Sequence, residues 1–504
     1  MKIFTTNQIR EIDAATIEKN GVTSLQLIDR VAENITCEII SRWRTNKRIA
    51  IFAGSGNNGA DALAVGRMLI DQGYRPEIFL FNIGGNRLSH DCAICKQRLL
   101  ELGDVDFTEV TGIFSLPHLS DQYLVIDGLF GSGLREPLSG CFVMLVRYIN
   151  ESGATVLSID VPSGLFGDWN PNAVNRNIIH ADLTMSVQFP RLSFFIADNA
   201  ELVGEWKVID IDLDPDEIRR KSAPFYLVDK NDVRRMLHKR NPFSSKADYG
   251  SALIAAGSYG MIGAAVMSAQ GALRAGVGKV TVHSPRCGFL PLQSAVPEAM
   301  FQGDKHEIAI TDIQLRHEYS AIAIGPGIGT NDLTADALEL LLKSQERPVV
   351  LDADALNCIA RRQSILNHIP VLSILTPHAG EFDRMFGPQP TAEARLCKAI
   401  EIAHYHKIII VLKGRYTAIV RPDGKIYFNS SGNPAMATPG SGDVLTGVIT
   451  AFLAQGYQPQ IAALMGVYVH GYAGDMAAET EGEYGVTAGD IAANIGRAIK
   501  SIAF

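Results

Sequence analysis

A glycine-rich turn near the C-terminus, Ala437-Thr-Pro-Gly-Ser-Gly-Asp443, stands directly before an apolar segment that predicts a helix. Gly440 and Gly442 would let the backbone approach an anion closely, and the free N–H groups of a helix N-terminus favour negative charge. Asp443 would repel a phosphate, but it could take a proton from an attacking hydroxyl group. A capping Asp after a tight turn explains the same residues, so this segment alone leaves both interpretations open.

Further polar segments of the second half follow β-rich runs. Asp352-Ala-Asp354 and Asn357 could hold a magnesium ion through water or cap a helix. Lys413-Gly-Arg-Tyr-Thr417 ends an apolar run, where it could bind the phosphates of a nucleotide or form a solvated hairpin. His378, between a predicted strand and a predicted helix, could contact substrate or phosphate or serve as a structural hydrogen-bonding residue. Each segment taken alone leaves a binding role and a structural role open.

Glycines and short polar side chains also cluster at three predicted strand ends of the first half. Gly54-Ser-Gly-Asn-Asn-Gly59 matches G-x-G-x-x-G, but the next strand ends in Asn82, where a nicotinamide dehydrogenase would place an acidic residue for the ribose. Asn58, Asp127 and Ser163 supply oxygen donors without a Cys or His, which suits a hard, weakly dehydrated cation better than zinc. Turn chemistry could also place these residue types here, although three clusters at successive strand ends favour a ligand site.

Short β-rich runs alternate with helical patterns along the chain, which predicts parallel α/β architecture. The predicted strands of the first half are 48–53, 77–81, 123–126, 155–159 and 183–187. Those of the second half are 252–256, 279–283, 321–324, 349–351 and 408–412. Ligands gather at the carboxyl ends of strands in open parallel sheets, so the residues at these ends are the candidates for binding and catalysis.

A change in composition marks the best candidate for a domain junction. The acidic run from Asp210 to Glu217 gives way to many basic residues between Arg219 and Arg240, which predicts a solvated, charged connector rather than a binding patch. A chain of 504 residues is too long for a single hydrophobic core. We therefore expect two domains, one on each side of this junction.

Composition limits the class of protein. With 47% hydrophobic residues, 20% charged residues and 46 glycines, the chain is typical of a soluble globular enzyme. Its net charge of −8 gives no general attraction to nucleic acid or anionic membranes, and no apolar run approaches the length of a bilayer span. Seven cysteines, and a start without a secretory signal, predict a reducing cytoplasm. The close pair Cys92 and Cys95 is expected to pack a helix face rather than to bind metal.

Residues 1–215 resemble the NAD(P)H-hydrate epimerase domain through Gly54-Ser-Gly-Asn-Asn-Gly, Asp127-Gly-Leu-Phe-Gly-Ser-Gly and Asp160-Val-Pro-Ser-Gly. The resemblance implies a Rossmann-like three-layer α/β fold that interconverts the R and S epimers of hydrated NADH and NADPH (NADHX and NADPHX) beside a potassium ion. It implies that Asn58, Asp127 and Ser163 contact potassium and that Asp160 is a catalytic residue. The substrate-binding residues that it implies are Asn57, Asn58, Gly59, Ala60, Asp61, Gly131, Ser132, Gly133, Leu134, Arg135, Glu136, Pro137 and Asp160.

The first half departs from the usual pattern of that family in two places. Ala60 and Ala62 stand where glycine is common, and Arg191 stands where lysine is common. If that lysine takes part in proton transfer, Arg191 cannot replace it, because guanidinium does not deprotonate near neutral pH. The sequence therefore leaves open a first half that only binds nucleotide or a partner and has lost catalysis.

The second half, residues 225–504 after a charged connector at 216–240, resembles the NAD(P)H-hydrate dehydratase domain, a ribokinase-like α/β fold. The shared motifs are Gly257-Ser-Tyr-Gly, Gly325-Pro-Gly-Ile-Gly, Asp352-Ala-Asp-Ala-Leu-Asn, Pro377-His-Ala-Gly-Glu, Lys413-Gly-Arg-Tyr-Thr and Ala437-Thr-Pro-Gly-Ser-Gly-Asp. The resemblance implies that ADP or ATP, with a magnesium ion, drives removal of water from the S epimer. The nucleotide contacts that it implies are Lys413, Gly414, Arg415, Tyr416, Thr417 and Gly442, and the hydrate contacts are Ala264, Gly327, His378 and Asp443.

The implied chemistry is coherent in itself. Hydroxide is a poor leaving group from a reduced nicotinamide ring, but phosphorylation makes the hydroxyl a good one, which the ring nitrogen's lone pair can expel. Asp443 would be the catalytic base for the hydroxyl proton, the amides of Gly440–Gly442 would stabilise the transferring phosphoryl group, and Lys413 would help hold the nucleotide. A ribokinase-type small-molecule kinase shares this arrangement and is the alternative.

The family implies two further expectations. Fusion of the two domains is typical of bacterial members, which generally prefer ADP, so conversion of ADP to AMP and phosphate is predicted. Members commonly assemble, so a homo-oligomer is expected.

Overall fold

The computed structural model describes residues 1–85, 87–171 and 177–504. It divides the chain into two compact units, residues 2–224 and Met1 with residues 225–504. The predicted connector region contains the helices α7 (Pro215–Arg220) and α8 (Lys230–Met236) and the strand β9 (Phe225–Val228). Within the described residues, no helix combines the length and the apolar character that crossing a membrane requires.

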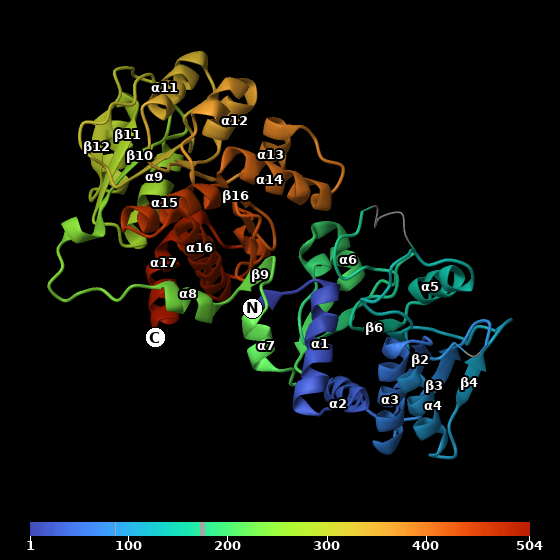
Figure 1. The fold of residues 1–504 in the computed structure, drawn as a ribbon. Helices are drawn as coiled ribbons and strands as arrows, with labels where there is room; N and C mark the ends of the chain where they lie inside the picture. The colour runs from blue at the N-terminus through green and yellow to red at the C-terminus, as the bar shows by residue number, and fades with distance from the viewer. Residues whose placement is uncertain (86, 172–176) are drawn as a thin grey trace. The chain divides into compact units, whose positions relative to one another are not determined.

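Seven parallel strands form the sheet of the N-terminal unit, in the order β4-β3-β2-β5-β6-β7-β8 (Figure 1). The five strands predicted for this half are all confirmed, and β5 continues two residues beyond its predicted end. The seven are β2 (Arg48–Ala53), β3 (Glu77–Phe81), β4 (Phe107–Val110), β5 (Tyr123–Gly128), β6 (Thr155–Ile159), β7 (Leu183–Val187) and β8 (Glu205–Ile209). A two-residue strand, β1 (Lys2–Ile3), begins the unit.

Helices cover both faces of this sheet. Phe52 and Phe79 share a core cluster with Val146 of α5, whereas a Cβ at Gly66 of α3 would lie 3.2 Å from Cδ1 of Ile51. Because successive residues of a strand point to opposite faces, α3 and α5 lie on opposite sides, which confirms the three-layer architecture. The helices are α1 (Thr6–Asn20), α2 (Ser24–Arg42), α3 (Asn57–Asp71), α4 (His90–Leu100), α5 (Cys141–Glu151) and α6 (Ala200–Val203), with α7. Both cysteines of the Cys92 and Cys95 pair are buried on α4.

The strand order of the N-terminal unit reverses between β2 and β5. From β2 the chain builds outward to β3 and β4, and it then returns to add β5, β6, β7 and β8 on the other side. Ala53 at the end of β2 pairs with Gly128 at the end of β5. In doubly wound sheets such a switch point leaves a crevice at the carboxyl ends of the strands, where ligands bind.

The C-terminal unit is built on a larger mixed sheet, in the order β9-β18-β17-β16-β15-β14-β13-β10-β11-β12. Its strands besides β9 are β10 (Ser251–Ala255), β11 (Lys279–Ser284), β12 (Met300–Gly303), β13 (Ala321–Ile324), β14 (Val350–Leu351), β15 (Ile374–Leu375), β16 (Ile409–Leu412), β17 (Ala418–Val420) and β18 (Ile426–Asn429). The predicted parallel α/β architecture is confirmed, and the short strand β17, which was not among the predicted strands, runs antiparallel to both β16 and β18. Two short hairpins join these strands, and hairpins impose antiparallel pairing.

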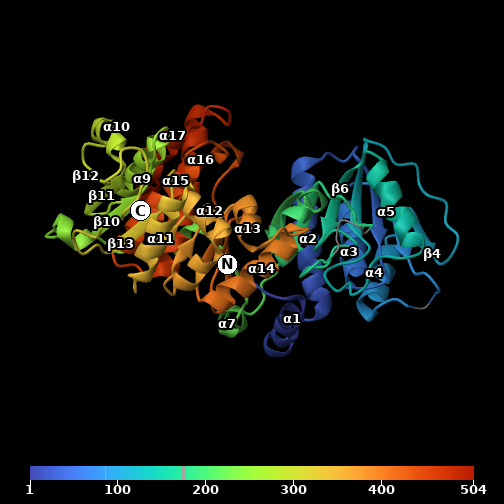
Figure 2. The ribbon, with the colours of Figure 1, turned by 90° about the horizontal axis from the view of Figure 1, so that it is seen from above.

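Helices cover both faces of this second sheet (Figures 1 and 2). Helices α9, α15, α16 and α17 share one core cluster with β10, β13 and β14. Close packing between α9 and α15 depends on small residues, because a Cβ at Gly447 would lie 2.0 Å from the carbonyl oxygen of Ser268. The helices besides α8 are α9 (Ile262–Arg274), α10 (Phe289–Ala295), α11 (Asp332–Lys343), α12 (Asp354–Arg361), α13 (Ala379–Phe386), α14 (Ala392–His406), α15 (Ser441–Ala454), α16 (Pro459–Glu481) and α17 (Ala488–Ala503).

Candidate active sites

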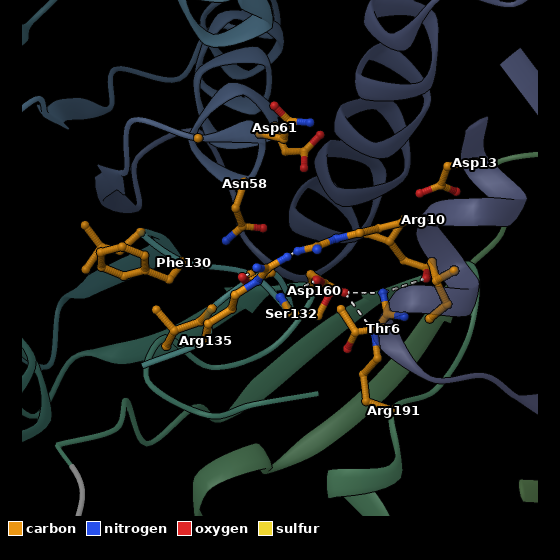
Figure 3. A pocket seen from close by; sticks show the side chains of 18 of the residues that line it. Thr6, Arg10, Asp13, Asn58, Asp61, Phe130, Ser132, Arg135, Asp160 and Arg191 are labelled. Carbon is orange, nitrogen blue, oxygen red and sulfur yellow. Dashed lines mark hydrogen bonds and ion pairs between the residues drawn. The ribbon is translucent and has the colours of Figure 1, made fainter. Parts of the chain in front are cut away.

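A cavity of about 710 Å³ lies at the switch point of the N-terminal unit (Figure 3). Its walls come from the segments that follow β2, β5, β6 and β7, together with α1 and α3. Most of the predicted substrate residues line this one cavity. They are Asn57, Asn58, Asp61, Gly131, Ser132, Gly133, Leu134, Arg135, Glu136 and Asp160.

The other predicted substrate residues of this half, Gly59, Ala60 and Pro137, are not among the described lining residues. Gly59 and Ala60 are buried at the start of α3, whereas Pro137 is exposed. A Cβ at Gly59 would lie 1.7 Å from the carbonyl oxygen of Gly54, so only glycine lets the helix begin against the turn. Ala62, one of the departures from the family pattern, is fully buried. Both alanines therefore belong to the packing of α3.

Asp160 is held by a buried ion pair. Arg191 donates to Oδ1 of Asp160 from Nη2 at 2.6 Å and from Nε at 3.1 Å, and the amide of Ser132 donates to Oδ2 at 2.8 Å. Burial alone would raise the pKa of Asp160, but Arg191 and Ser132 hold that pKa below its ordinary value. Asp160 also has a left-handed backbone conformation, with φ of 67°. It is therefore a fixed anion and a weak base.

Two polar atoms beside this pair have no partner among the described residues. Arg191 is only 3% exposed, yet its Nη1 makes no hydrogen bond. The Nδ2 atom of Asn58 is likewise buried and unpartnered. Both residues line the cavity, and a Cβ at Gly131 would lie about 3 Å from both Asp160 and Asn58. Buried polar atoms are normally hydrogen-bonded, so these two indicate a polar ligand.

Asp127 and Ser163 lie beneath the cavity and are fully buried. The Ser163 hydroxyl donates to Oδ1 of Asp127 at 2.5 Å, and the Ser163 amide and the Ser158 hydroxyl each donate to Oδ2 at 2.8 Å. Burial raises the pKa of Asp127, although these donors oppose the shift. The carbonyl oxygen of Phe130 lies 3.2 Å from Oγ of Ser163. The cluster is thus made of oxygen atoms, the donor type that alkali and alkaline-earth cations prefer.

Helix α1 contributes lining residues that the sequence motifs did not reveal: Thr6, Ile9, Arg10 and Asp13. Burial raises the pKa of Asp13 to about 6, with Arg191 opposing and Asp160 adding to the shift. Burial also raises the pKa of Asp61 well above its ordinary value, and Asp160 and Asp13 add to that shift. The sequence offers no spacing signal for Asp13, because α1 is distant in sequence from the strand-end motifs.

In the C-terminal unit, Asp443 lies in the first turn of α15. Gly440 takes a left-handed conformation, with φ of 87°, and so begins the helix as the glycine-rich turn predicts. No described residue donates a hydrogen bond to the Asp443 carboxyl group. Burial raises the pKa of Asp443 to about 7, with Asp352 adding to the shift and Lys413 opposing it. A carboxyl group with a pKa near neutrality can exchange a proton with substrate.

Lys413 belongs to a charged network beside that turn. Its Nζ donates to Oδ1 of Asp352 at 3.1 Å and lies 3.7 Å from Oε2 of Glu381. Thr446 of α15 donates to the other oxygen of Asp352 at 2.7 Å. A Cβ at Gly442 would lie 3.5 Å from Nζ of Lys413, so the cation faces the turn. Burial alone would lower the pKa of Lys413, but Asp352 and Glu381 raise it, and the side chain stays charged.

A cavity of about 700 Å³ adjoins this network. The predicted site residues among its lining are His378, Lys413, Gly414, Arg415, Thr417 and Gly442. Tyr416 is not among the described lining residues; the guanidinium of Arg415 lies over its ring, 4.8 Å from the centroid. Lining residues that the sequence motifs did not reveal include Asn429, Asn433 and His470. Burial lowers the pKa of His470 to about 4, so this ring is neutral.

His378 caps α13, the structural role that the sequence left open. Its Nδ1 accepts hydrogen bonds from the amides of Gly380 at 3.0 Å and Glu381 at 3.3 Å. The side chain is nevertheless 53% exposed at the cavity. Because Nδ1 is an acceptor, the neutral tautomer carries its proton on Nε2, and this atom lies 3.5 Å from Oε1 of Glu381.

Of the predicted hydrate contacts, His378 is among the described lining residues of that cavity, whereas Asp443, Ala264 and Gly327 are not. Ala264 and Gly327 lie next to each other. A Cβ at Gly327 would lie 3.0 Å from Cβ of Ala264. Asp354 is close in sequence to Asp352 but has other partners, since it accepts from the amide of Gly329 at 2.9 Å and from Asn357 at 3.1 Å. The carboxyl groups of Asp352 and Asp354 thus already accept hydrogen bonds, each from a different set of donors.

Comparison with known proteins places both units in one family. Residues 252–497 match the family model described as NAD(P)H-hydrate dehydratase, and residues 24–193 match that described as YjeF-related protein N-terminus. The ADP/ATP-dependent NAD(P)H-hydrate dehydratase from Bacillus subtilis, a solved structure, is 34% identical with a TM-score of 0.50, over 55% of this chain and 98% of that one.

Two curated relatives match over nearly the whole length. The bifunctional NAD(P)H-hydrate repair enzyme of Thermofilum pendens is 33% identical over 100% of this chain and 97% of the relative. That of Moorella thermoacetica is 32% identical over 97% of this chain and 95% of the relative. On this full-length similarity, the chain belongs to the family of bifunctional NAD(P)H-hydrate repair enzymes.

Proposed function

We propose that the chain repairs hydrated NADH and NADPH in two steps. The N-terminal unit interconverts the R and S epimers, and the C-terminal unit removes water from the S epimer while converting ADP to AMP and phosphate. The observation that carries the proposal is the Asp443 carboxyl group. It has no hydrogen-bond donor among the described residues, its pKa is about 7, and it lies in the helix-initiating glycine turn beside Lys413.

The dehydration begins with transfer of the terminal phosphoryl group to the hydrate. The hydroxyl oxygen attacks phosphorus while Asp443 takes the hydroxyl proton, and AMP leaves from ADP. The amides of the Gly440–Gly442 turn stabilise the charge on the transferring group. The ring nitrogen's lone pair then expels phosphate, and the departing phosphate takes a proton from the neighbouring ring carbon, which restores the double bond of NAD(P)H.

The proposal divides the binding roles between two sets of residues. Lys413, Gly414, Arg415, Tyr416, Thr417 and Gly442 hold the nucleotide, and Ala264, Gly327, His378 and Asp443 contact the hydrate. The 700 Å³ cavity supports the nucleotide assignment, because most of the first set lines it. Tyr416 would act there only by supporting Arg415.

A magnesium ion at this site would be held mainly by the phosphate groups of the nucleotide. The relative from Bacillus subtilis was crystallised with ATP and Mg²⁺. Here the carboxylates of Asp352 and Asp354 already accept hydrogen bonds from Lys413, Thr446, Gly329 and Asn357. Phosphate oxygens and water would therefore supply most of the ligands, as is usual for Mg²⁺.

The N-terminal site fits a potassium ion near Asn58, Asp127 and Ser163. Its support is the buried cluster of oxygen atoms around Oγ of Ser163, together with the amide oxygen of Asn58 beside Gly131. Bound there, the ion would supply positive charge beside the substrate. We expect epimerisation to require K⁺ and to be lost when an organic cation such as tetramethylammonium replaces it, with dehydration as the control activity. Unchanged epimerisation without K⁺ would contradict this part of the proposal.

One assay of the whole protein tests the proposed function. Mixed hydrate epimers are supplied with ADP, with ATP or without nucleotide, and NADH absorbance at 340 nm and the two epimers are followed. We expect recovery of NADH with nucleotide, interconversion of the epimers without it, and more rapid turnover with ADP. A stable phosphorylated product without NADH would instead favour a small-molecule kinase.

A further inference from the structure

The epimerase site needs a proton donor and a proton acceptor, and the residues first suspected there supply neither. Asp160 accepts three hydrogen bonds, two of them from Arg191. Arg191 itself cannot release a proton near neutral pH. The cavity is lined by three more carboxyl groups, those of Asp13, Asp61 and Glu136. Glu136 lies on an exposed segment, whereas Asp13 and Asp61 are half-buried.

Asp13 and Asp61 come from two different helices, α1 and α3, and lie above Asp160 in the view of Figure 3. No described residue donates a hydrogen bond to either carboxyl group, so both are free to meet a ligand. The cavity between them and Asp160 is also lined by Arg191 and Asn58, whose Nη1 and Nδ2 atoms are buried and unpartnered. These orphan donors indicate that a polar ligand occupies the space that the two carboxyl groups face.

We propose that Asp13 and Asp61 are the proton-transfer pair of the epimerase site. The inference rests on the proposed function of the N-terminal unit and assigns the residues that perform its chemistry. Burial raises the pKa of Asp13 to about 6, and burial with the neighbouring Asp160 and Asp13 raises the pKa of Asp61 well above its ordinary value, so Asp13 is the group that ionises first. The pair thereby presents one acid and one base at the same time.

The reaction requires both forms. The hydroxyl group leaves its ring carbon with a proton from the acid, which releases water, while the ring nitrogen's lone pair forms a C=N bond. Water then adds to the other face of that carbon, its proton passes to the carboxylate, and the C=N electron pair returns to nitrogen. One carboxyl group has lost a proton and the other has gained one, so atoms and charge balance and the configuration is inverted.

The surroundings of Asp13 determine how this pair responds to pH. The charged groups that face it are Arg10 on its own helix, Asp61 on α3, and Asp160 with Arg191 on the segments after β6 and β7. Its pKa of about 6 means that the carboxylate form is lost as pH falls through 6. We expect the rate of epimerisation to fall with it, because no base then remains to accept the proton of the added water.

The test compares Asp13→Asn and Asp61→Asn with Glu18→Gln, an exposed position on α1 outside the cavity. Interconversion of the epimers is measured in the full chain without nucleotide, against an enzyme-free blank. We expect each Asn variant to lose about 100-fold or more in kcat with little change in KM, since acid–base groups typically contribute this much. Glu18→Gln should retain the full rate. The pH profile of Asp13→Asn should lack the limb near pH 6.

Two controls make the result decisive. NADH recovery from the S epimer with ADP shows that each variant is folded and that its dehydratase unit is active. If Asp13→Asn epimerises at the unsubstituted rate, or keeps the same pH limb, the inference is overturned. If the unsubstituted protein itself fails to interconvert the epimers, the proposed function of the N-terminal unit fails instead.

Discussion

The two candidate sites use similar sequence elements and differ in how their central aspartate is surrounded. Each site pairs glycine turns with an aspartate, Asp160 after β6 and Asp443 at the start of α15. Asp160 is bound by Arg191 and its pKa lies below the ordinary value, whereas Asp443 has no hydrogen-bond donor among the described residues and its pKa is about 7. The partner of a buried carboxyl group, and not the motif that carries it, therefore decides whether the group can exchange a proton.

The largest expected effect comes from removing the titratable aspartate. Asp443→Asn keeps the size of the side chain but cannot accept the hydroxyl proton, so we expect dehydration to fall by about 10²–10⁴-fold. Epimerisation should be unchanged, because it belongs to the other unit. Recovery of NADH absorbance measures the first activity, and separation of the epimers measures the second. Near-normal dehydration would show that Asp443 is not the base.

The second change breaks the ion pair of the other aspartate. Arg191→Met leaves Asp160 buried without its cation, which should cost about 3–5 kcal/mol of unfolding free energy in the N-terminal unit. Arg191→Lys restores a charge at this position and serves as the matched control. Urea unfolding of the two variants provides the measurement. Equal stability of the two would mean that the ion pair contributes no stabilisation that depends on charge.

The different pKa values of Asp443 and Asp160 predict that the rates of the two activities depend on pH in different ways. Asp443 acts as a base in its ionised form, so dehydration should decline as pH falls through 7, by about tenfold per unit well below it. Asp160 stays ionised throughout this range, because its pKa is lowered, so a decline of epimerisation near pH 6 would belong to Asp13. Profiles of kcat/KM for the two activities between pH 5 and 9 give the comparison, with Asp443→Asn expected to lack the dehydration limb. A dehydration rate that does not change with pH would show that Asp443 is not the base whose ionisation limits dehydration.

The smallest expected effect concerns the support of Lys413. Thr446→Val keeps the shape of the side chain but removes the hydrogen bond to Asp352, which should weaken nucleotide binding by about 1–2 kcal/mol. Thr450→Val on the same helix is the matched control, because the hydroxyl that it removes donates to the backbone oxygen of Thr446 and not to Asp352. The KM for ADP should rise in Thr446→Val alone. Equal KM values would mean that Asp352 holds Lys413 without this bond.

Much of the fold followed from local patterns. All ten predicted strands are present within two residues of their predicted ends, because buried parallel strands appear as short apolar runs between turn residues. Two of the strands that were not predicted, β15 and β17, are only two and three residues long. Runs this short carry little periodicity, and their pairing depends on neighbouring strands that are remote in sequence.

The site residues, like the strands, include some that local sequence patterns predict and others that they do not. The glycine turns around Asn58, Asp160 and Asp443 were recognisable because the residues that make each turn are consecutive. Asp13 and the Asp352–Lys413 ion pair were not recognisable as parts of a site from spacing alone. Lys413 and Asp352 are 61 residues apart, and Asp13 reaches the cavity only through the packing of α1.

The two α/β units, the strand-end glycine turns and the family resemblance of each half could be predicted from the sequence, because short runs of consecutive residues carry each of them. The protonation behaviour of the carboxyl groups arises only in the folded chain. That behaviour depends on burial and on charges within a few ångströms, and both arise when segments far apart in the chain come together. Asp160 and Asp443 look alike in the sequence and differ because one meets Arg191 and the other meets Asp352 and Lys413.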